Sequence, residues 1–445
     1  MLQIWPGATN VDLKYFGDAS NPRILILGKY AALSAEAATK MKRPLEFMAL
    51  GSRLGALASR RAATMSFVDG TSFGSETATA TSKTVICEKS RPLRMSPEIK
   101  SLRFGKQSLP VLGSYDVLVV GGGTAGAPAA LASAESGART LLVEYLDELG
   151  GVGTAGLIGK YWYGIRDGFT ARIDKAIGAS AQGWNVVTKS EWMRQQILKA
   201  EGEIWYRSFG CGALVESDQV RGVIVATPRG RGVVLAKTVI DGTGNSDIAA
   251  HANARTRFSI GSKGQLSVQL SGAPGRNLED HYNNTCFALV DDCDAIDLWH
   301  LMLNRRAACY RKFDVGQLVD SRERQRIVGD YTLTTQDILI GRTFPDTVLR
   351  LKSNFDAAAF PNSTILMIKN MKGPAYTCNM PYRCFLPKGL SGIIVIGLGA
   401  STERDAITLT RMQPDLQNQG YAMGLAAAMA ASCCGKTRSI DIKAL

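Results

Sequence analysis

Apolar and polar residues follow two different spacings along the chain, and each change of spacing predicts a new element. The segment "YDVLVV" (115–120) is apolar at almost every position, which is typical of a parallel strand buried on both faces. The small-residue segment "TAGAPAALASAESG" (124–137) predicts a helix, and "RTLLVE" (139–144) predicts the next strand. Pro128 suits the first turns of that helix, and Gly137 suits the position after its last turn. Together these segments predict a strand–helix–strand unit.

A second group of elements is predicted to follow further along the chain. The segment "SEWMRQQILKAEG" (190–202) has apolar residues at helical spacing, with Ser190 as its expected N-cap, and "EIWYRS" (203–208) predicts a strand. Three short apolar runs come next, "CGALVES", "VRGVIVAT" and "GVVLA", and the turns "DQ" and "PRGR" join them. This spacing is typical of an antiparallel meander. The last run continues into "KTVIDGTGNSD" (237–247), which predicts a strand that ends in glycines.

The C-terminal part repeats the sequence of strand, glycine turn and helix. The segment "LSGIIVIGLGAS" (390–401) predicts a buried strand closed by glycines, and "QGYAMGLAAAMAAS" (419–432) predicts a helix of small residues. We expect this strand to return to the strand–helix–strand unit of residues 115–144.

Composition places the chain among large globular proteins. Its 445 residues are 45% apolar and 20% charged, which is enough to bury a large core in two or three domains. Its 9 cysteines include no CxxC pair, which favours a reduced protein without disulfides. The N-terminal segment carries acids where a signal peptide needs an apolar core, and no apolar run approaches the roughly 20 residues of a membrane span. The sequence therefore predicts a soluble, cytoplasmic protein.

Positive charge is concentrated in the first quarter of the chain. Residues 1–113 hold 16 Lys and Arg against 8 Asp and Glu, so +8 of the net charge of +13 lies there. The basic segment "KMKRPLEFMALGSRLGALASRR" (40–61) suggests contact with nucleic acid or anionic lipid. Aromatic residues are not interleaved with its charges, so we favour a solvated helix face and expect no nucleic-acid partner. The role of this extension stays open.

The most specific motif follows the first predicted strand. Gly121, Gly123 and Gly126 have the GxGxxG spacing. In this motif the first glycine allows a tight turn, the second admits a pyrophosphate, and the third lets the helix pack on the strand. The remaining residues of the predicted dinucleotide-binding turn are Gly122, Thr124 and Ala125. A larger side chain at Gly123 is expected to abolish binding, whereas Gly126→Ala is expected to be milder.

An acid stands at the end of the second predicted strand. Glu144 lies 23 positions after Gly121, where a carboxylate accepts the hydrogen bonds of an adenosine ribose. A buried acid in this place has no other evident partner. The combination of strand, glycines, helix, strand and terminal acid therefore predicts a dinucleotide site, with Glu144 on the ribose.

Three later turns also offer bare backbone amides. The first of them follows Glu144 and contains Gly150, Gly151 and Thr154, which form a second candidate anion-binding turn. The other two close the strands predicted at residues 237–241 and 390–396. Their candidate cofactor-binding residues are Gly242, Thr243 and Gly244 in one turn, and Gly397 and Gly399 in the other.

The order of these segments resembles that of FAD-binding oxidoreductases with the glutathione-reductase-like fold. The resemblance implies FAD rather than NAD as cofactor. It also implies an α/β fold, in which a Rossmann-like FAD-binding domain of three-layer β/β/α architecture carries an inserted substrate domain and an N-terminal extension. The implied divisions are 1–113 for the basic extension, 114–255 and 385–435 for the discontinuous FAD-binding domain, and 256–384 for the substrate domain.

Two further segments resemble the family known simply as FAD-dependent oxidoreductases, a bacterial group sometimes described as xanthan-lyase-like. They are "DSRERQRIVGDYTLTTQDIL" (320–339) and "MPYRCFLPKGLSGIIVIGLG" (380–399). The resemblance covers about three quarters of the chain. It implies that an organic substrate, such as a carbohydrate or an alcohol, gives a hydride to the flavin N5 atom, and that a separate acceptor reoxidises the flavin. Neither a metal site nor a disulfide-reductase cysteine pair is expected.

The chain departs from this family's pattern where histidines are expected. Ala357–Ala359 stand in one of these places and Glu403 stands in the other. Glu403 or Asp405 is therefore the expected catalytic base, on condition that burial raises the pKa of the carboxyl toward neutrality. Chains of this family also commonly continue beyond a segment such as "IDIKAL", so this chain is expected to be shortened at its C-terminus.

Two alternatives to an active enzyme follow from the same observations. The missing histidines suggest a flavin-binding protein with lost or altered catalysis. The basic extension suggests instead an interaction module joined to a redox-inert fold. The sequence leaves the substrate, the electron acceptor and the oligomeric state open.

Overall fold

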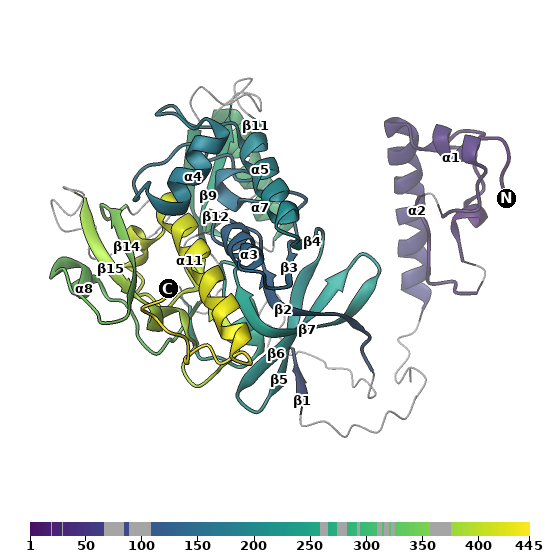
Figure 1. Ribbon diagram of the computed structural model, residues 1–445. Helices are drawn as coiled ribbons and strands as arrows, with labels where there is room; N and C mark the ends of the chain where they lie inside the picture. Colours follow the sequence, from purple (N-terminus) through teal and green to yellow (C-terminus); the bar gives the residue numbers. More distant parts are fainter. Residues whose placement is uncertain are drawn as a thin grey trace. The chain divides into compact units, whose positions relative to one another are not determined.

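The structure is a computed structural model of the chain, and two compact units can be described in it (Figure 1). One contains residues from the first 65 positions, and the other contains every described residue from 84 onward. The described residues are 1–65 without 19 and 29, 84–88, 108–258, 266–273, 283–291, 294–308, 314–315, 320–321, 325–356 and 375–445.

The N-terminal unit is a small helical assembly. Its elements are the 3₁₀ turn η1 (Leu13–Phe16) and the helices α1 (Ala35–Met41) and α2 (Pro44–Thr64). Ser34 caps α1 by accepting the Ala37 N–H, and Pro44 begins α2, where a missing N–H costs nothing. The buried side chains of this unit include Phe16, Met41, Leu50 and Leu54.

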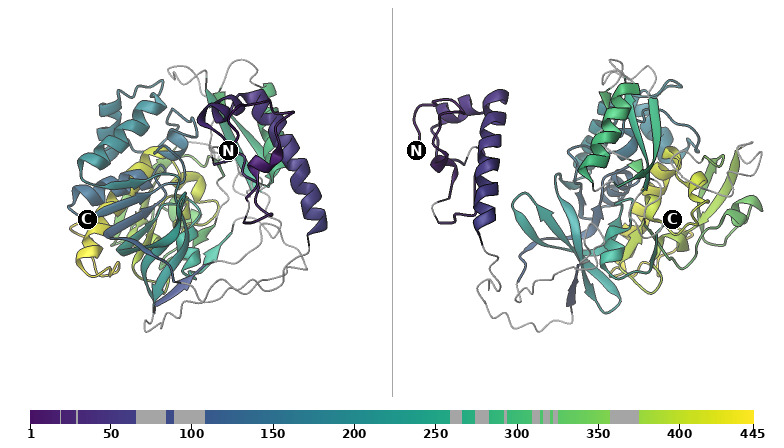
Figure 2. Two further views of the ribbon diagram at one scale, coloured as in Figure 1. Left: turned by 90° about the vertical axis from the view of Figure 1, so that its right-hand side faces the viewer. Right: turned by 180° about the vertical axis from the view of Figure 1, so that it is seen from behind.

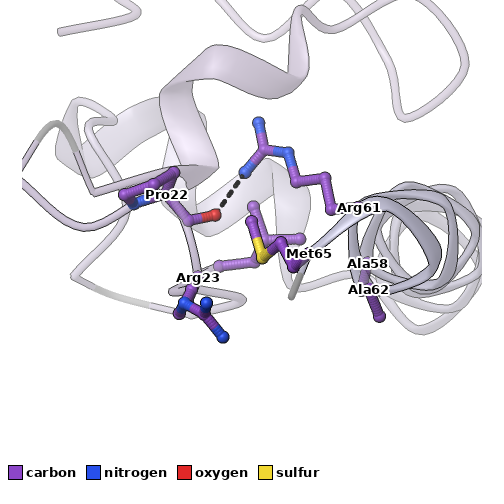
Figure 3. Close-up of a pocket in the computed structure, with 7 residues that line it drawn as sticks. Pro22, Arg23, Ala58, Arg61, Ala62 and Met65 are labelled. Atoms are coloured by element: carbon purple, nitrogen blue, oxygen red, sulfur yellow. Dashed lines mark hydrogen bonds between the residues drawn. The ribbon is translucent and has the colours of Figure 1, made fainter. Parts of the chain in front are cut away.

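A groove of about 520 Å³ lies along the C-terminal end of α2 (Figure 3). Arg61 Nη1 donates a hydrogen bond of 3.1 Å to the carbonyl oxygen of Pro22 across this groove. The other lining residues are Arg23, Leu25, Ala58, Ala62 and Met65. Apolar side chains and two arginines therefore line the groove together.

The main unit is built on one eight-stranded sheet with the order β1-β5-β6-β7-β2-β3-β4, in which β16 also pairs with β7. Its strands are β1 (Thr84–Cys87), β2 (Val111–Val120), β3 (Thr140–Val143), β4 (Glu203–Trp205), β5 (Phe209–Glu216), β6 (Gln219–Thr227), β7 (Gly230–Asp241) and β16 (Ile393–Val395). Strand β1 belongs to the stretch predicted as an extension, yet it pairs with β5.

Strand β7 joins the two parts of this sheet. One edge of β7 pairs in parallel with β2 over almost its whole length. On the other edge, residues 230–235 pair antiparallel with β6, and Val239–Asp241 pair in parallel with β16. The predicted meander β5-β6-β7 is therefore confirmed. The C-terminal strand β16 joins the sheet along the part of β7 that follows the residues paired with β6.

Alternate residues of β2 are buried in different cores. Val117 and Val119 pack in the core that contains helices α3 (Gly126–Glu135) and α11 (Gln413–Ser432). Leu118 and Val120 pack in a second core with strands of the meander and with α6 (Asp247–His251). A sheet buried on both faces explains why "YDVLVV" is apolar almost throughout. These layers confirm the predicted α/β class with its Rossmann-like arrangement.

Helices α3 and α11 lie side by side because glycines allow their backbones to approach (Figure 1). A Cβ on Gly420 would overlap the carbonyl oxygen of Ala125. Ser133 Oγ donates a hydrogen bond of 3.0 Å to the carbonyl oxygen of Gly424. Helix α11 begins six residues before the predicted start at 419, because its first turns bury polar side chains that give no helical apolar pattern.

Two further helices pack on this pair, since α5 (Val186–Lys199) contacts α3, and α4 (Gly168–Ile177) contacts α11 and α5. The predicted N-cap of α5 is wrong. Asn185 caps the helix by accepting the Thr188 N–H at 3.0 Å, and Ser190 lies inside the helix. Among the described residues, no helix is long and apolar enough to cross a membrane.

The stretch predicted as a substrate domain contributes smaller elements to the main unit. A four-stranded sheet with the order β10-β9-β11, and with β12 beside β9, lies next to helix α7 (Ala295–Ala308), as Figure 2 shows. Its strands are β9 (Leu266–Ala273), β10 (Asn283–Val290), β11 (Asp314–Val315) and β12 (Asp320–Ser321). The remaining elements are β8 (Thr256–Arg257), β13 (Arg326–Ile327), α8 (Thr335–Leu339), β14 (Thr347–Ser353) and β15 (Tyr376–Pro381). The predicted domain boundaries stay predictions.

Candidate cofactor site

The first glycine turn follows β2, and protein atoms lie close to three of its glycines, Gly121, Gly122 and Gly126. Gly121 has a φ of +95°, and an added Cβ there would meet the carbonyl group of Gly242. A Cβ on Gly126 would overlap the carbonyl oxygen of Gly121. This overlap weighs against the expectation that Gly126→Ala is milder than a larger side chain at Gly123, because backbone atoms cannot move aside as a flexible side chain can.

Gly123 differs from its neighbours because it faces open space. An added Cβ would have only the Cα of Gly151 within reach, at 4.0 Å. The amides of Gly123, Thr124 and Ala125 donate to no acceptor among the described residues. These amides precede the first turn of α3, where backbone N–H groups and the helix dipole favour an anion. The turn therefore has the room and the donors that a pyrophosphate needs.

Glu144 lies at the end of β3 and is buried. Its Oε2 atom accepts the Gly122 N–H at 2.5 Å, and its Oε1 atom accepts the Leu146 N–H at 2.8 Å. The expectation that this acid lacks another partner is therefore wrong. Burial raises the pKa of the Glu144 carboxyl, and hydrogen bonds from backbone amides oppose that rise. The carboxylate ties the first turn to the end of β3.

The second glycine turn lies directly against the first. Gly150 and Gly151 have φ angles of +102° and +60°, which favour glycine. The Gly150 N–H donates to the Gly122 carbonyl oxygen at 2.9 Å, and Thr124 Oγ1 donates to the Gly150 carbonyl oxygen at 3.1 Å. Thr154 uses its own hydroxyl inside the turn, where it donates to the Leu149 carbonyl oxygen at 2.6 Å. The two predicted turns thus form one continuous surface of backbone.

Side chains from distant elements hold the second turn in place. Ser190 Oγ accepts the Leu149 N–H at 2.9 Å, and Trp184 Nε1 donates to the Gly153 carbonyl oxygen at 2.9 Å. Gln413, at the start of α11, donates from Nε2 to the Ile158 carbonyl oxygen at 2.9 Å. Sequence reasoning missed these residues, since nothing in the spacing of Trp184 or Gln413 connects either one with the glycines.

The third turn follows β7 and is organised by Asp241, which sequence reasoning also missed. Asp241 Oδ1 accepts the Thr243 hydroxyl at 2.7 Å, and its Oδ2 accepts the Ala249 N–H at 2.9 Å. Burial raises the pKa of the Asp241 carboxyl to about 6. Gly244 has a φ of +72° and no atom close to an added Cβ. An acid at the end of a buried strand, as at Glu144, is the signal that could have identified Asp241.

The fourth turn brings the C-terminal strand to the others. The Gly397 N–H donates to Gln419 Oε1 on α11 at 2.6 Å, and a Cβ on Gly397 would lie 4.0 Å from the Cβ of Ala125. Ser246 Oγ donates to the Gly399 carbonyl oxygen at 3.0 Å, which links this turn to the third. The structure therefore gathers all four predicted turns at the carboxyl ends of parallel strands, where ligands bind in open α/β sheets.

The two predicted catalytic carboxylates lie beyond the fourth turn. Glu403 is exposed, so the burial on which its expected role as base depended is not found. Its Oε2 atom accepts the Thr335 N–H at 2.9 Å at the start of α8. Asp405 Oδ1 lies 3.6 Å from Arg404 Nη1. The expected histidine position at Ala357–Ala359 lies outside the described residues. Within the part of the chain that the structure describes, no group of three His, Cys, Asp or Glu side chains is arranged to hold a metal ion.

The sequence of this chain matches one known protein family. Residues 116–300 and 298–445 match the family described as FAD dependent oxidoreductase. Comparison with curated protein sequences gave no significant match.

Three proteins of known structure are among those that match parts of this chain. A geranylgeranyl bacteriochlorophyll reductase-like protein from Thermoplasma acidophilum is 14% identical, with 72% of this chain and 79% of that chain covered and a TM-score of 0.41. An anhydrotetracycline hydroxylase from Streptomyces rimosus is 13% identical, with coverage of 72% and 63% and a TM-score of 0.40. A myxobacterial chondrochloren halogenase is 15% identical, with coverage of 75% and 77% and a TM-score of 0.35.

The sequence match alone carries the assignment, because TM-scores below 0.5 support no argument about this chain. The matched residues run from 116 to the C-terminus and include all four glycine turns. The predicted family and the predicted cofactor, FAD, are confirmed. The chain belongs to the family of FAD-dependent oxidoreductases.

Proposed function

We propose that FAD binds across the four glycine turns, with its pyrophosphate at Gly123 and its adenosine ribose at Glu144. The open space and unused amides at Gly123–Ala125 carry this proposal. Glu144 already accepts two backbone N–H groups, but a carboxylate has about four acceptor positions. It can therefore hold the first turn and accept ribose hydroxyls at the same time.

The second and third turns are proposed to line the remainder of the cofactor. Gly151 packs against Gly123, so that a group bound at the first turn also meets the second. Thr154 uses both its N–H and its hydroxyl within the turn, so its contribution is to fix the turn's shape. Gly244 presents open backbone after β7, and Gly397 and Gly399 close the site beside α11.

The bound flavin supplies a two-electron acceptor, and the chain is proposed to present an organic substrate such as a carbohydrate or an alcohol to it. Glu403 is the proposed base for the substrate hydroxyl. It follows the fourth turn by four residues, and the Thr335 N–H fixes one carboxylate oxygen while the other is able to accept a proton. Asp405 is the second candidate, two residues further along.

One observation favours a second candidate function, a flavin-binding protein without this oxidation. The Glu403 carboxylate accepts the Thr335 N–H at the start of α8, which is a structural task that an acid performs without any catalysis. The two functions differ in whether any substrate reduces the flavin.

The test is anaerobic single-turnover reduction of the FAD-bound protein by a panel of sugars and alcohols. We expect at least one substrate to bleach the flavin, and Glu403→Gln to slow that step about 100-fold while FAD stays bound. The matched control is Glu201→Gln, which changes an exposed acid between α5 and β4. Full FAD content with no bleaching by any substrate would favour the second function, and an unchanged rate in Glu403→Gln would remove Glu403 from the reaction.

A further inference from the structure

Lys189 is a fully buried lysine directly behind the second glycine turn. It lies on α5 and is 1% exposed. Its Nζ atom would lie 3.4 Å from a Cβ added to Gly153, and 3.8 Å from the ring centroid of Trp184, whose Nε1 donates to Gly153. The amine therefore touches both the turn and the side chain that supports it.

The amine makes too few hydrogen bonds to compensate for its removal from water. Its one hydrogen bond among the described residues is a long one, 3.4 Å to Tyr161 Oη. Gln413 Oε1 also faces Gly153 and has no partner in the described part of the chain. A buried ammonium without a direct carboxylate partner destabilises a fold, and an apolar side chain of similar volume would pack here without that cost.

A chain of hydrogen bonds leads from Lys189 to the surface. Tyr161 Oη donates to Asp174 Oδ1 on α4 at 2.8 Å, and Gln417 of α11 donates to Tyr161 Oη at 3.0 Å. Asp174 Oδ2 accepts Arg166 Nε at 2.8 Å, and the Arg166 side chain is 45% exposed. Among the described residues, Tyr161, Asp174 and Arg166 are thus the titratable and charged groups that face the amine, and α11 faces it with the neutral side chains of Gln413 and Gln417.

We propose that Lys189 takes up a proton when the FAD bound at the adjacent turns is reduced, and that Tyr161 and Asp174 carry this proton from solvent. The inference rests on the proposed FAD site. The two electrons and one proton that convert bound FAD to its anionic reduced form come from the hydride of the proposed organic substrate, or from a sacrificial photodonor in the test below. The further proton goes from water to the neutral amine, which becomes an ammonium ion, so that charge is balanced inside the protein.

The physical reason is electrostatic coupling in a dry environment. Burial lowers the pKa of the Lys189 ammonium to about 7; Asp174 opposes this shift and Arg166 adds to it. Near neutral pH the amine is therefore close to half neutral. A negative charge on the reduced flavin favours the ammonium form, and by linkage the ammonium favours the reduced flavin to the same extent.

The test is proton uptake during photoreduction of the FAD-bound protein, followed with a pH indicator in weakly buffered solution. At pH 8, wild type should take up about 0.4 proton more per flavin than Lys189→Met, because a pKa that rises from about 7 to about 8 takes the amine from about one tenth to about one half protonated. The control Lys199→Met changes an exposed lysine on the same helix and should match wild type. Tyr161→Phe should retain the uptake at equilibrium but slow it.

A second measurement keeps the inference testable in wild type if Lys189→Met fails to fold. In NMR spectra of protein with labelled lysines, the signal that is missing in Lys189→Arg belongs to Lys189. The titration midpoint of this signal should rise when the bound flavin is reduced. Bound FAD with equal proton uptake in wild type and Lys189→Met, or a midpoint that does not move, would overturn the inference and leave the FAD site intact. A wild-type protein that binds no FAD would instead overturn the proposed function.

Discussion

The first and second glycine turns lie side by side, yet different interactions hold them. The first turn is fixed by backbone packing, in which Gly121 and Gly126 let β2, α3 and the third turn come into contact. The second turn is fixed by side chains, because Ser190 bonds the Leu149 N–H and Trp184 bonds the Gly153 carbonyl oxygen. Gln413 fixes the backbone just after it through the carbonyl oxygen of Ile158. We infer that substitutions at the packed glycines Gly121 and Gly126, or at Glu144, affect folding and FAD binding together. Substitutions at Gly123, which faces open space, or around the second turn affect mainly the cofactor.

The largest expected effect is that of Gly126→Val in the first turn. The added side chain overlaps the Gly121 carbonyl oxygen, so α3 would have to move away from β2. We expect the free energy of unfolding of the main unit to fall by more than about 4 kcal/mol, or no folded protein at all. Urea denaturation followed by circular dichroism measures this loss. A stable Gly126→Val protein would show that backbone contact is not what holds the first turn.

Glu144→Ala is expected to have the next largest effect, because this residue serves both folding and binding. The Gly122 and Leu146 N–H groups would lose their buried acceptor. Each loss is expected to lower the free energy of unfolding by roughly 1–3 kcal/mol. FAD affinity should fall about 100-fold, since the ribose would also lose its acceptor. Titration with FAD and urea denaturation measure the two effects. Wild-type FAD affinity in Glu144→Ala would make the acid purely structural.

Trp184→Phe is expected to have the smallest effect and to separate the two turns. The change keeps most of the ring but removes the hydrogen bond to the Gly153 carbonyl oxygen. We expect unfolding to become easier by about 1 kcal/mol and FAD affinity to fall about tenfold. Trp192→Phe, on α5 and outside this turn, is the control. A stability loss as large as that of Glu144→Ala, with unchanged FAD affinity, would contradict the division between the turns.

The same contrast explains what the sequence could predict. The first turn and its strands were predictable because the GxGxxG spacing, the helix and Glu144 all lie within one short segment. The residues that support the second turn were not predictable, because Gln413, for example, is 255 positions away from the Ile158 carbonyl that it binds. Ser190 was misread as a helix cap for the same reason, because its partner is the distant Leu149 amide. Long-range hydrogen bonds leave no periodic trace in a sequence.

Gly123→Val tests most directly whether the open amides of the first turn hold the cofactor. Gly55 on α2 also has open space around an added Cβ, so Gly55→Val is the matched control. FAD titration of the two folded variants and wild type should give one FAD per chain for wild type and Gly55→Val, and an affinity at least about 100-fold weaker for Gly123→Val. A folded Gly123→Val protein that binds FAD as tightly as wild type would contradict the account.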